Sequence, residues 1–549
     1  MKKKIICIFG CMLLIAATVL PVAGTMNNNK ISTDTRHQEL DNLNNCNIMA
    51  SWIEKAKLTA SDGANNDFFG FVSVCGDYAV IGAYGDDNAN GVAAGSAYVF
   101  KRTGTSWAQE AKLLASDGAT VDAFGYSVSI DGDYAIIGAY RDDNANGVDA
   151  GSAYVFKRTG TSWTQEAKLL ASSGAAGDEF ARSVSICGDT VVIGSYGDDS
   201  SGVDAGSAYV FKRTGTSWAQ EAKLLASDGA AGDNLGFSVS IDGDYAIAGA
   251  YCDDNANGAD AGSAYVFKRT GTSWAQEAKL LASDGATGDG FGFSVSIYGD
   301  YAVIGTPYDD GWRGSAYIFK RTGTSWAQEA KLTVSSTIGD WFGCSVSISG
   351  DIVIIGANGE SPNGAAYIFK RTGTSWSQEA KLLASDGAAG DNFGCSVSID
   401  GIRVIVGASS KNALTGAAYI FEQSNQPPNT PTITGPLSGT VGTSYTYTFT
   451  STDPDGDQVS YYVEWGDTTN TGWFGPFASG TPQTKSHTWS TQGTYIIQAK
   501  AKDTNGAESG WGSLTITMPR NKAIQNIMFL QFIEEFPLLQ RLLQSLGLQ

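Results

Sequence analysis

The sequence predicts an all-β protein, in which a seven-bladed β-propeller of four-stranded antiparallel blades is followed by a small C-terminal β-sandwich. Three observations lead to this fold class. One stretch of text recurs seven times, each copy alternates apolar and polar residues with the period of a strand, and the composition changes after Phe421. No amphipathic helical pattern interrupts the repeats.

The repeat is the first of these observations. An acidic residue stands just before a Phe-Gly or related pair in every copy, and successive copies lie 51 to 56 residues apart. The seven acidic residues are Asp67, Asp122, Asp178, Asp233, Asp289, Asp340 and Asp391. A period of this length is typical of propellers and related arrays.

Each copy reads as four short strands. In the second copy we expect them at 124–130, 133–139, 152–158 and 162–170. Asp131-Gly132 separates the first two strands and Thr159-Gly160-Thr161 the last two, and both are tight-turn sequences because Gly tolerates positive φ. Alternate positions hold Ser, Ala and Gly, which lets flat sheets approach one another as blades.

The two ends of the repeat region predict that the ring closes. Residues 52–58 read as a fourth strand with no blade before it, while the seventh copy stops after its third strand at Phe421. Pairing between them removes both open sheet edges. We therefore expect a closed propeller over residues 52–422. An open solenoid is the alternative, and it would need capping repeats.

The repeats resemble the FG-GAP repeat of the integrin α-subunit propeller. The resemblance is carried by "FG" followed some twelve residues later by "GAY", and it weakens at Phe180-Ala181 and Leu235-Gly236. Members of that family often carry a D-x-D-x-D-G calcium loop between the first two strands. Here that place holds short turns such as Asp131-Gly132-Asp133, so the usual metal site is not carried over.

The composition agrees with a globular extracellular protein. Residues 1–24 read as a signal peptide, with a basic start, an apolar run and small residues at its end, and residues 25–51 as a leader. We expect a secreted or cell-surface location. The 36 basic and 56 acidic residues give a net charge of −20, which disfavours nucleic acid and anionic membranes as partners. A merely solvated acidic surface explains the charge equally well.

A Pro-rich linker at 423–430 leads to a second β unit at 431–518. This unit resembles a PKD-type, immunoglobulin-like domain in the run from Asp453 to Asp457, in Trp465-Gly466-Asp467 and in the text from Gly493 to Gly506. The resemblance implies a spacer. The acidic residues of the first run read as turn formers, with calcium binding as the alternative.

The last segment, 519–549, reads as an amphipathic tail that docks on a partner, a sorting factor or the envelope; a helix folded on the protein's own domain is the alternative. Charged residues interrupt every apolar run of transmembrane length, so we expect no membrane span after signal cleavage.

Strand parity places the loops after the second and fourth strands of every blade on one face. Three of these loops follow the D-x-[DN]-x-[DN]-G start of a calcium loop. The candidate calcium ligands are Asp86, Asn88, Asn90, Asp142, Asn144, Asn146, Asp253, Asn255 and Asn257. One carboxylate per loop predicts weak affinity, of the order of 10⁻⁴ to 10⁻³ M. Exposed β loops favour the same residue types, so a purely structural role stays open.

The later copies abandon this loop, which makes the rim asymmetric. The fifth copy shows Trp312 and Arg313, an exposed aromatic beside a cation, as the expected ligand contacts; packing of the Trp at a sheet edge is the alternative. The opposite face carries six Lys-Arg pairs and is expected to be basic.

No catalytic residue is assigned. The chain has two histidines, and neither His37 nor His487 lies in the propeller, so a histidine triad or a zinc site there is excluded. The sequence thus predicts a non-enzymatic adhesion or recognition protein that binds an extracellular protein or glycan through the propeller rim, with calcium at the rim loops as the candidate cofactor. The alternatives are a passive envelope component and a carboxylate-based glycan-processing enzyme.

Overall fold

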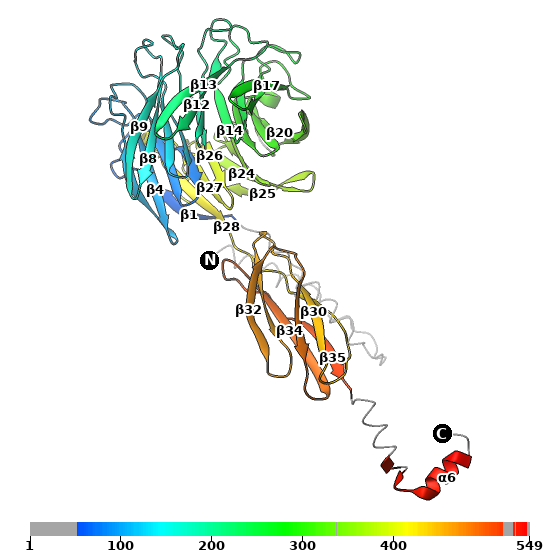
Figure 1. Ribbon diagram of the computed structural model, residues 1–549. Helices are drawn as coiled ribbons and strands as arrows, with labels where there is room; N and C mark the ends of the chain where they lie inside the picture. Colours follow the sequence, from blue (N-terminus) through cyan, green and yellow to red (C-terminus); the bar gives the residue numbers. More distant parts are fainter. Residues whose placement is uncertain (1–51, 336, 520–530, 533, 546–549) are drawn as a thin grey trace, which may run out of the picture. The chain divides into compact units, whose positions relative to one another are not determined.

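The computed structural model describes residues 52–335, 337–519, 531–532 and 534–545 (Figure 1). The predicted signal peptide and leader, and the first part of the C-terminal tail, lie outside the described residues. Strands dominate the described part, as the alternating sequence pattern predicts.

Seven antiparallel sheets of four strands each form the blades, which confirms the predicted propeller. The strands of blades one to three are β2 (Phe71–Cys75), β3 (Tyr78–Ala83), β4 (Ser96–Thr103), β5 (Ser106–Leu113), β6 (Ser127–Asp131), β7 (Tyr134–Ala139), β8 (Ser152–Thr159), β9 (Ser162–Leu169), β10 (Val184–Cys187), β11 (Thr190–Ser195), β12 (Ser207–Thr214) and β13 (Ser217–Leu224). Those of blades four to six are β14 (Ser238–Asp242), β15 (Tyr245–Ala250), β16 (Ser263–Thr270), β17 (Ser273–Leu280), β18 (Ser294–Tyr298), β19 (Tyr301–Thr306), β20 (Ser315–Thr322), β21 (Ser325–Leu332), β22 (Ser345–Ser349), β23 (Ile352–Ala357), β24 (Ala365–Thr372) and β25 (Ser375–Leu382).

The seventh blade joins the two ends of the ring. It contains β26 (Phe393–Asp400), β27 (Arg403–Ala408) and β28 (Ala417–Gln423), and its outer strand is β1 (Trp52–Leu58). β1 pairs antiparallel with β28 from Trp52 opposite Gln423 to Leu58 opposite Ala418. In Figure 1 the blue strand β1 accordingly lies beside the yellow strand β28. The ring closure leaves no open edge between the first and last blades.

The Phe-Gly pair has a packing role in each blade. Phe124 is buried against Tyr154 and Phe156, with ring centroids 5.4 and 6.0 Å apart. Gly125 has φ of 95°, and a Cβ there would lie 2.2 Å from the Ser96 carbonyl oxygen. The aromatic contact recurs at Phe69, Phe180, Phe291, Phe342 and Phe393, and Leu235 takes its place in the fourth blade. In the second blade the motif therefore fills the space between sheets that leave no room for a side chain at the glycine, while the third blade holds Ala181 at this position with φ of 72°.

A ring of serines ties the innermost strands together. Each hydroxyl accepts a hydrogen bond of 3.1 or 3.2 Å from a backbone N–H of the next blade, as Ser129 does from Ile186. The seven serines are Ser73, Ser129, Ser185, Ser240, Ser296, Ser347 and Ser398, and the bond from Val74 to Ser398 spans the closure. These serines are thus inter-blade acceptors.

The C-terminal unit is a two-sheet sandwich with Trp465 and Trp489 in its core. Its strands are β29 (Thr432–Thr434), β30 (Ser444–Thr450), β31 (Val459–Glu464), β32 (Asn470–Phe477), β33 (Gln483–Thr488), β34 (Gly493–Asp503) and β35 (Gly512–Met518). Asp453 Oδ1 accepts hydrogen bonds from the backbone N–H groups of Asp455 and Asp457, which is the turn-forming role expected of this run.

Helical segments are short. α3 (Asp309–Trp312) and α4 (Lys411–Leu414) are four-residue turns in propeller loops, and α6 (Pro537–Ser545) lies in the tail. α6 exposes Leu538 and Leu542. Within the described residues, none of the helices has the length and hydrophobicity needed to cross a membrane.

Candidate functional site: the loop face of the propeller

The loops between the second and third strands of each blade and the loops that connect successive blades form one surface, here named the loop face. Neighbouring loops on it are joined by backbone hydrogen bonds. Val121 N–H donates to the Val92 carbonyl at 2.9 Å, Gly177 N–H to Val148 at 2.9 Å, and the amides of Gly339 and Trp341 to Trp312 at 3.0 and 3.3 Å. These bonds hold the loops in a fixed arrangement, unlike most exposed loops.

Apolar side chains project from the tips of these loops. Val92, Val148 and Val203 occupy the same position in the first three blades and are 61%, 62% and 66% exposed. Trp312 and Ile338 in the later loops are 55% and 72% exposed. Large apolar residues gathered on one face of a protein mark an interaction surface more often than isolated ones do.

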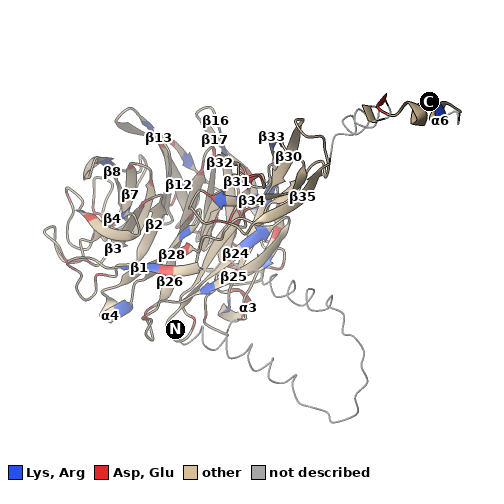
Figure 2. Cartoon of the chain, turned by 90° about the horizontal axis from the view of Figure 1, so that it is seen from below, with Lys and Arg blue, Asp and Glu red and all other residues tan. Residues whose placement is uncertain are grey.

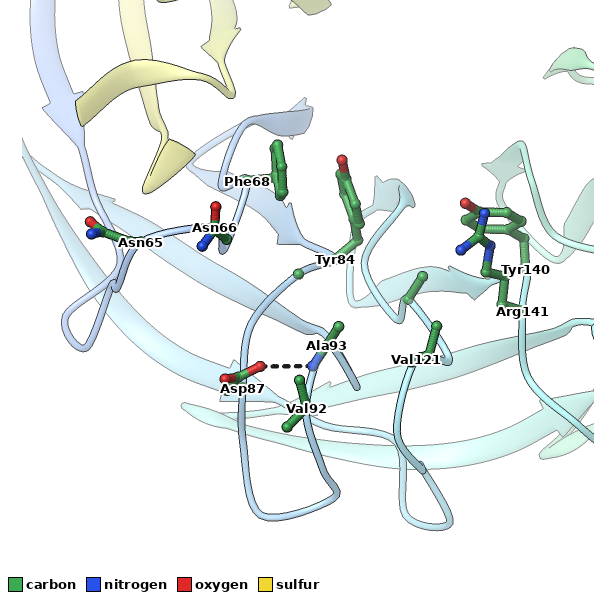
Figure 3. A pocket seen from close by; sticks show the side chains of 12 residues that line it. Asn65, Asn66, Phe68, Tyr84, Asp87, Val92, Ala93, Val121, Tyr140 and Arg141 are labelled. Atoms are coloured by element: carbon green, nitrogen blue, oxygen red, sulfur yellow. Dashed lines mark hydrogen bonds between the residues drawn. The ribbon is translucent and has the colours of Figure 1, made fainter. Parts of the chain in front are cut away.

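Two of the cavities on the loop face lie between its loops. The first has a volume of about 310 Å³ and lies between the loops of blades one and two. Figure 3 shows Phe68 and Tyr84 along one side and Val92 and Val121 along another, with the Asp87 carboxylate accepting a 2.8 Å hydrogen bond from the Ala93 N–H. The cavity thus combines aromatic and aliphatic walls with a fixed carboxylate.

The second cavity, of about 240 Å³, is lined by Trp312 together with Tyr251, Tyr308 and Asp260. The rings of Tyr308 and Trp312 are 6.1 Å apart. Arg313 is exposed, and its guanidinium donates to the Asp310 carbonyl at 3.2 Å. The structure therefore places Trp312 at a cavity wall and Arg313 beside it on the surface.

The candidate calcium loops are held by the protein's own hydrogen bonds. Asp142 is 2% exposed, and its carboxylate accepts from the Tyr154 hydroxyl at 3.1 Å and contacts Lys168 Nζ at 3.0 Å. Asn144 and Asn146 direct their amide N–H groups to backbone carbonyls, as Asn146 does to Ala171 at 2.9 Å. The same contacts form around Asp86, Asn88 and Asn90 and around Asp253, Asn255 and Asn257.

A cation at these loops would have to displace a lysine ammonium and turn two amides. Within the part of the chain that the structure describes, no group of three or more His, Cys, Asp or Glu side chains is gathered as a metal site would require. Calcium binding stays a prediction. The spacing that suggested it also serves Asx turns, since Asn144 Oδ1 accepts from the Asn146 N–H.

Connecting-loop aspartates form a second acidic set on this face. Asp122 and Asp178 are buried and accept hydrogen bonds from the N–H groups of Ala119 and Ala175 at 2.6 and 2.9 Å. Burial raises the pKa of both carboxyls to about 6, and the neighbouring acid Asp142 adds to the effect at Asp122. Their role is structural, because they fix the turn that precedes each Phe-Gly pair.

The opposite, turn face differs from expectation. All six arginines of its Lys-Arg pairs form ion pairs, and Figure 2 shows acidic and basic residues both distributed around the blades. The pairs are Arg102–Asp77, Arg158–Asp133, Arg213–Asp189, Arg269–Glu221, Arg321–Asp300 and Arg371–Asp351. The expected basic face is therefore an ion-paired one, since most of the partners are turn aspartates between the first two strands.

Comparison with known families agrees with the repeat geometry. The model of the FG-GAP repeat matches residues 52–100, 107–156, 163–211, 218–267, 274–319, 326–369 and 376–421, one match per blade. The chain belongs to the FG-GAP repeat family. The matches cover most of the propeller, so the family assignment rests on the same residues that build the blades.

Solved structures add the identity of the sandwich. The PKD domain of an M14-like peptidase from Thermoplasmatales archaeon SCGC AB-540-F20 is 54% identical over 18% of this chain and 99% of that domain, with a TM-score of 0.17. This identity over the whole domain shows that the sandwich of the FG-GAP protein is PKD-like.

A puromycin-hydrolyzing peptidase of Mycobacterium tuberculosis is 11% identical over 74% of this chain and 62% of its own, with a TM-score of 0.38. Among curated proteins, none matches the chain.

Sequence reasoning missed one group of residues on the loop face. The residue directly after each Phe-Gly pair points to a third cavity, of about 260 Å³, at the centre of the ring. The signal was present in the repeat alignment, because this position changes from Phe and Tyr to Arg182 and to Cys, while in most copies the residue before it is Gly and the residue after it is Ser.

Proposed function

We propose that this FG-GAP protein is a secreted or cell-surface adhesion and recognition protein that binds an extracellular protein or glycan through the loop face. The observation that carries the proposal is the gathering of exposed Val92, Val148, Val203 and Trp312 on loops that are fixed to one another by backbone hydrogen bonds. A preorganised surface loses little conformational entropy when a partner binds.

The asymmetry of the loop face supports a specific partner. Blades one to three share the same valine tip, whereas the fifth blade presents Trp312 over a cavity with two tyrosines. Exposed Trp beside Arg is a frequent composition of binding hot spots. The PKD-like domain serves as a spacer, and the tail with exposed Leu538 and Leu542 as a site of envelope attachment.

The rival proposal is a passive envelope component, for which the closed ring and its paired edges provide a stable disc. It predicts self-assembly of the purified chain and no saturable ligand. No enzymatic activity is proposed, because the acidic residues that recur in several blades are engaged in structural hydrogen bonds.

Binding of the labelled chain to intact cells and to a glycan array, in calcium and in EDTA, tests the proposal. We expect saturable binding that falls at least tenfold in Trp312→Ala and in the triple variant Val92→Ser, Val148→Ser, Val203→Ser. Sensitivity to EDTA and to Asp142→Ala or Asp253→Ala would establish the predicted calcium assistance. Insensitivity would leave recognition without the metal.

The turn face supplies a matched control. Tyr298 ends β18 on that face and is 47% exposed, so Tyr298→Ser removes an exposed aromatic comparable to Trp312 without touching the loop face. This variant should bind as the unchanged chain does. Equal loss in both variants, or absence of binding with self-assembly in its place, would favour the envelope proposal.

A further inference from the structure

The central opening of the propeller has one cationic residue in an otherwise aromatic and neutral ring. Seven equivalent positions, one per blade, lie at the loop-face end of the innermost strands and together line the cavity of about 260 Å³. They are Phe71, Tyr126, Arg182, Phe237, Phe293, Cys344 and Cys395. Because every blade contributes its equivalent residue, the cavity is the mouth of the central channel.

Aromatic rings hold the Arg182 side chain. Its guanidinium carbon lies 4.6 Å from the ring centroids of both Tyr126 and Phe237, the equivalent residues of the two neighbouring blades. Tyr196 and Tyr140 are 5.5 and 5.7 Å away. Contacts of this kind stabilise the cation over the ring faces. The Tyr196 hydroxyl accepts a hydrogen bond from the guanidinium, and the remaining N–H donors, which lie in the guanidinium plane, are left for another partner.

Among the described residues, no acidic side chain forms an ion pair with this cation. The ion pairs of the described residues include the Arg of every turn-face Lys-Arg pair, such as Arg213 with Asp189, but none includes Arg182. The acid nearest in sequence, Glu179, instead accepts a hydrogen bond from the Tyr196 hydroxyl. A half-buried guanidinium without a carboxylate partner can donate hydrogen bonds to an anionic ligand.

The far wall of the cavity leaves room for such a ligand. In a ring of seven, the positions opposite the third blade belong to the sixth and seventh, which carry Cys344 and Cys395. These side chains are smaller than the aromatic ones elsewhere in the ring. Burial raises the pKa of the Cys344 thiol to about 12, and it raises the pKa of Cys395 as well, so neither supplies a negative charge at neutral pH.

We propose that the channel mouth binds a carboxylate group, which accepts hydrogen bonds from the Arg182 guanidinium while its apolar body packs against Phe71 and Phe293. The carboxylate belongs either to a small free acid or to an Asp or Glu side chain of a protein that docks on the loop face. The second source rests on the proposed function, whereas the first does not.

Titration of the full chain with 4-fluorobenzoate, followed by fluorine NMR, tests the proposal, with 4-fluorobenzamide as the neutral probe. We expect a dissociation constant of about 1 mM for the benzoate, the range expected of so small a ligand. The benzamide should bind at least tenfold more weakly. The decisive variant is Arg182→Phe, which introduces the residue of the fourth and fifth blades at this position and should abolish benzoate binding.

Arg141→Gln is the matched control, because Arg141 lies on the same face, has the same charge and lines the cavity between blades one and two. It should leave benzoate binding unchanged. The proposal is overturned if benzoate does not bind, if benzamide binds equally, or if Arg141→Gln and Arg182→Phe weaken binding alike. A melting curve establishes that Arg182→Phe is folded.

Capped Gly-Glu-Gly and Gly-Gln-Gly peptides distinguish the two sources. If the unchanged chain binds the Glu peptide but not the Gln peptide, and Arg182→Phe binds neither, the site is assigned to acidic side chains of a partner. Binding of benzoate without the Glu peptide would assign it to free acids. The Trp312→Ala test of partner binding does not depend on either result. Failure of the carboxylate site therefore does not imply failure of the proposed function, and the reverse also holds.

Discussion

The second and seventh blades carry opposite charges at the same loop position. In the second blade this position is Asp142, which is buried and contacts Lys168 of the outer strand at 3.0 Å. In the seventh blade it is Lys411, which is 2% exposed and contacts the buried Asp391 at 2.8 Å. The loop has thus exchanged an acid for a base without a change in the blade.

The rest of the network is the same in both blades. A tyrosine of the third strand donates to an aspartate of the preceding connecting loop, Tyr154 to Asp117 at 3.0 Å and Tyr419 to Asp386 at 2.6 Å. The outer-strand lysine pairs with that aspartate in each case. The loop sequence can therefore vary as long as the buried charged residue forms an ion pair. The residues that recur across blades stabilise the blade itself.

Removal of Lys411 should have the largest effect. Lys411→Met leaves Asp391 buried without its cation, and the loss of one partner of a buried pair typically costs about 3 to 5 kcal/mol. We expect that decrease in the free energy of unfolding, measured by urea denaturation of the purified chain with tryptophan fluorescence. The double variant described next separates the charge effect from lost packing.

Lys411→Met combined with Asp391→Asn removes both charges and should recover more than half of the loss. A single variant that costs less than about 1 kcal/mol would mean that Asp391 is protonated or hydrated in the folded protein, and the comparison between the two blades would lose its electrostatic basis.

Lys168→Met in the second blade should cost less, about 1 to 3 kcal/mol. Asp142 keeps the hydroxyl donors of Ser152 and Tyr154 when the lysine is removed, whereas Asp391, among the described residues, accepts from Lys411 and from the Ala388 N–H. A double-mutant cycle with Asp142→Asn, monitored by urea denaturation, measures the coupling. Equal costs for Lys168→Met and Lys411→Met would show that the hydroxyl donors contribute nothing.

The fold was predictable because its signals are local or periodic. Strand alternation fixed the four-stranded unit, the period fixed the number of blades, and the unmatched strand at 52–58 fixed the closure with β28. Each of these depends on residues close in the chain or repeated in register. The blades and their number could therefore be predicted without any distance between atoms.

The candidate site was less predictable because its contacts join residues about one repeat apart. Arg182 lies against Phe237 of the next blade, and Lys168 reaches back to Asp117 of the connecting loop. The alternating Asp and Asn of the loops match both a calcium ligand set and a network of internal hydrogen bonds. The contacts observed in the structure are those of the second pattern, because Asn144 and Asn146 donate to backbone carbonyls and Lys168 contacts Asp142.

The smallest expected effect concerns the connecting-loop aspartates, which have a lysine partner in the seventh blade and none in the second and third. Burial raises the pKa of Asp122 and Asp178 from 3.8 to about 6. A folded-state pKa above the unfolded value means that these groups stabilise the fold at low pH and lose that contribution as pH rises through about 6. Their stabilising effect is therefore absent at pH 7.5.

Asp122→Asn and Asp178→Asn should consequently raise the free energy of unfolding at pH 7.5 by about 1 to 2 kcal/mol each and by less at pH 4.5. The amide oxygen can still accept the Ala119 N–H, so the turn is preserved. Asp391→Asn is the matched control and should do the reverse at pH 7.5, because it removes the partner of buried Lys411. Thermal melts of the three variants at pH 7.5 and pH 4.5 measure these changes in stability. A gain in all three variants would mean that the lysine does not distinguish the seventh blade from the others.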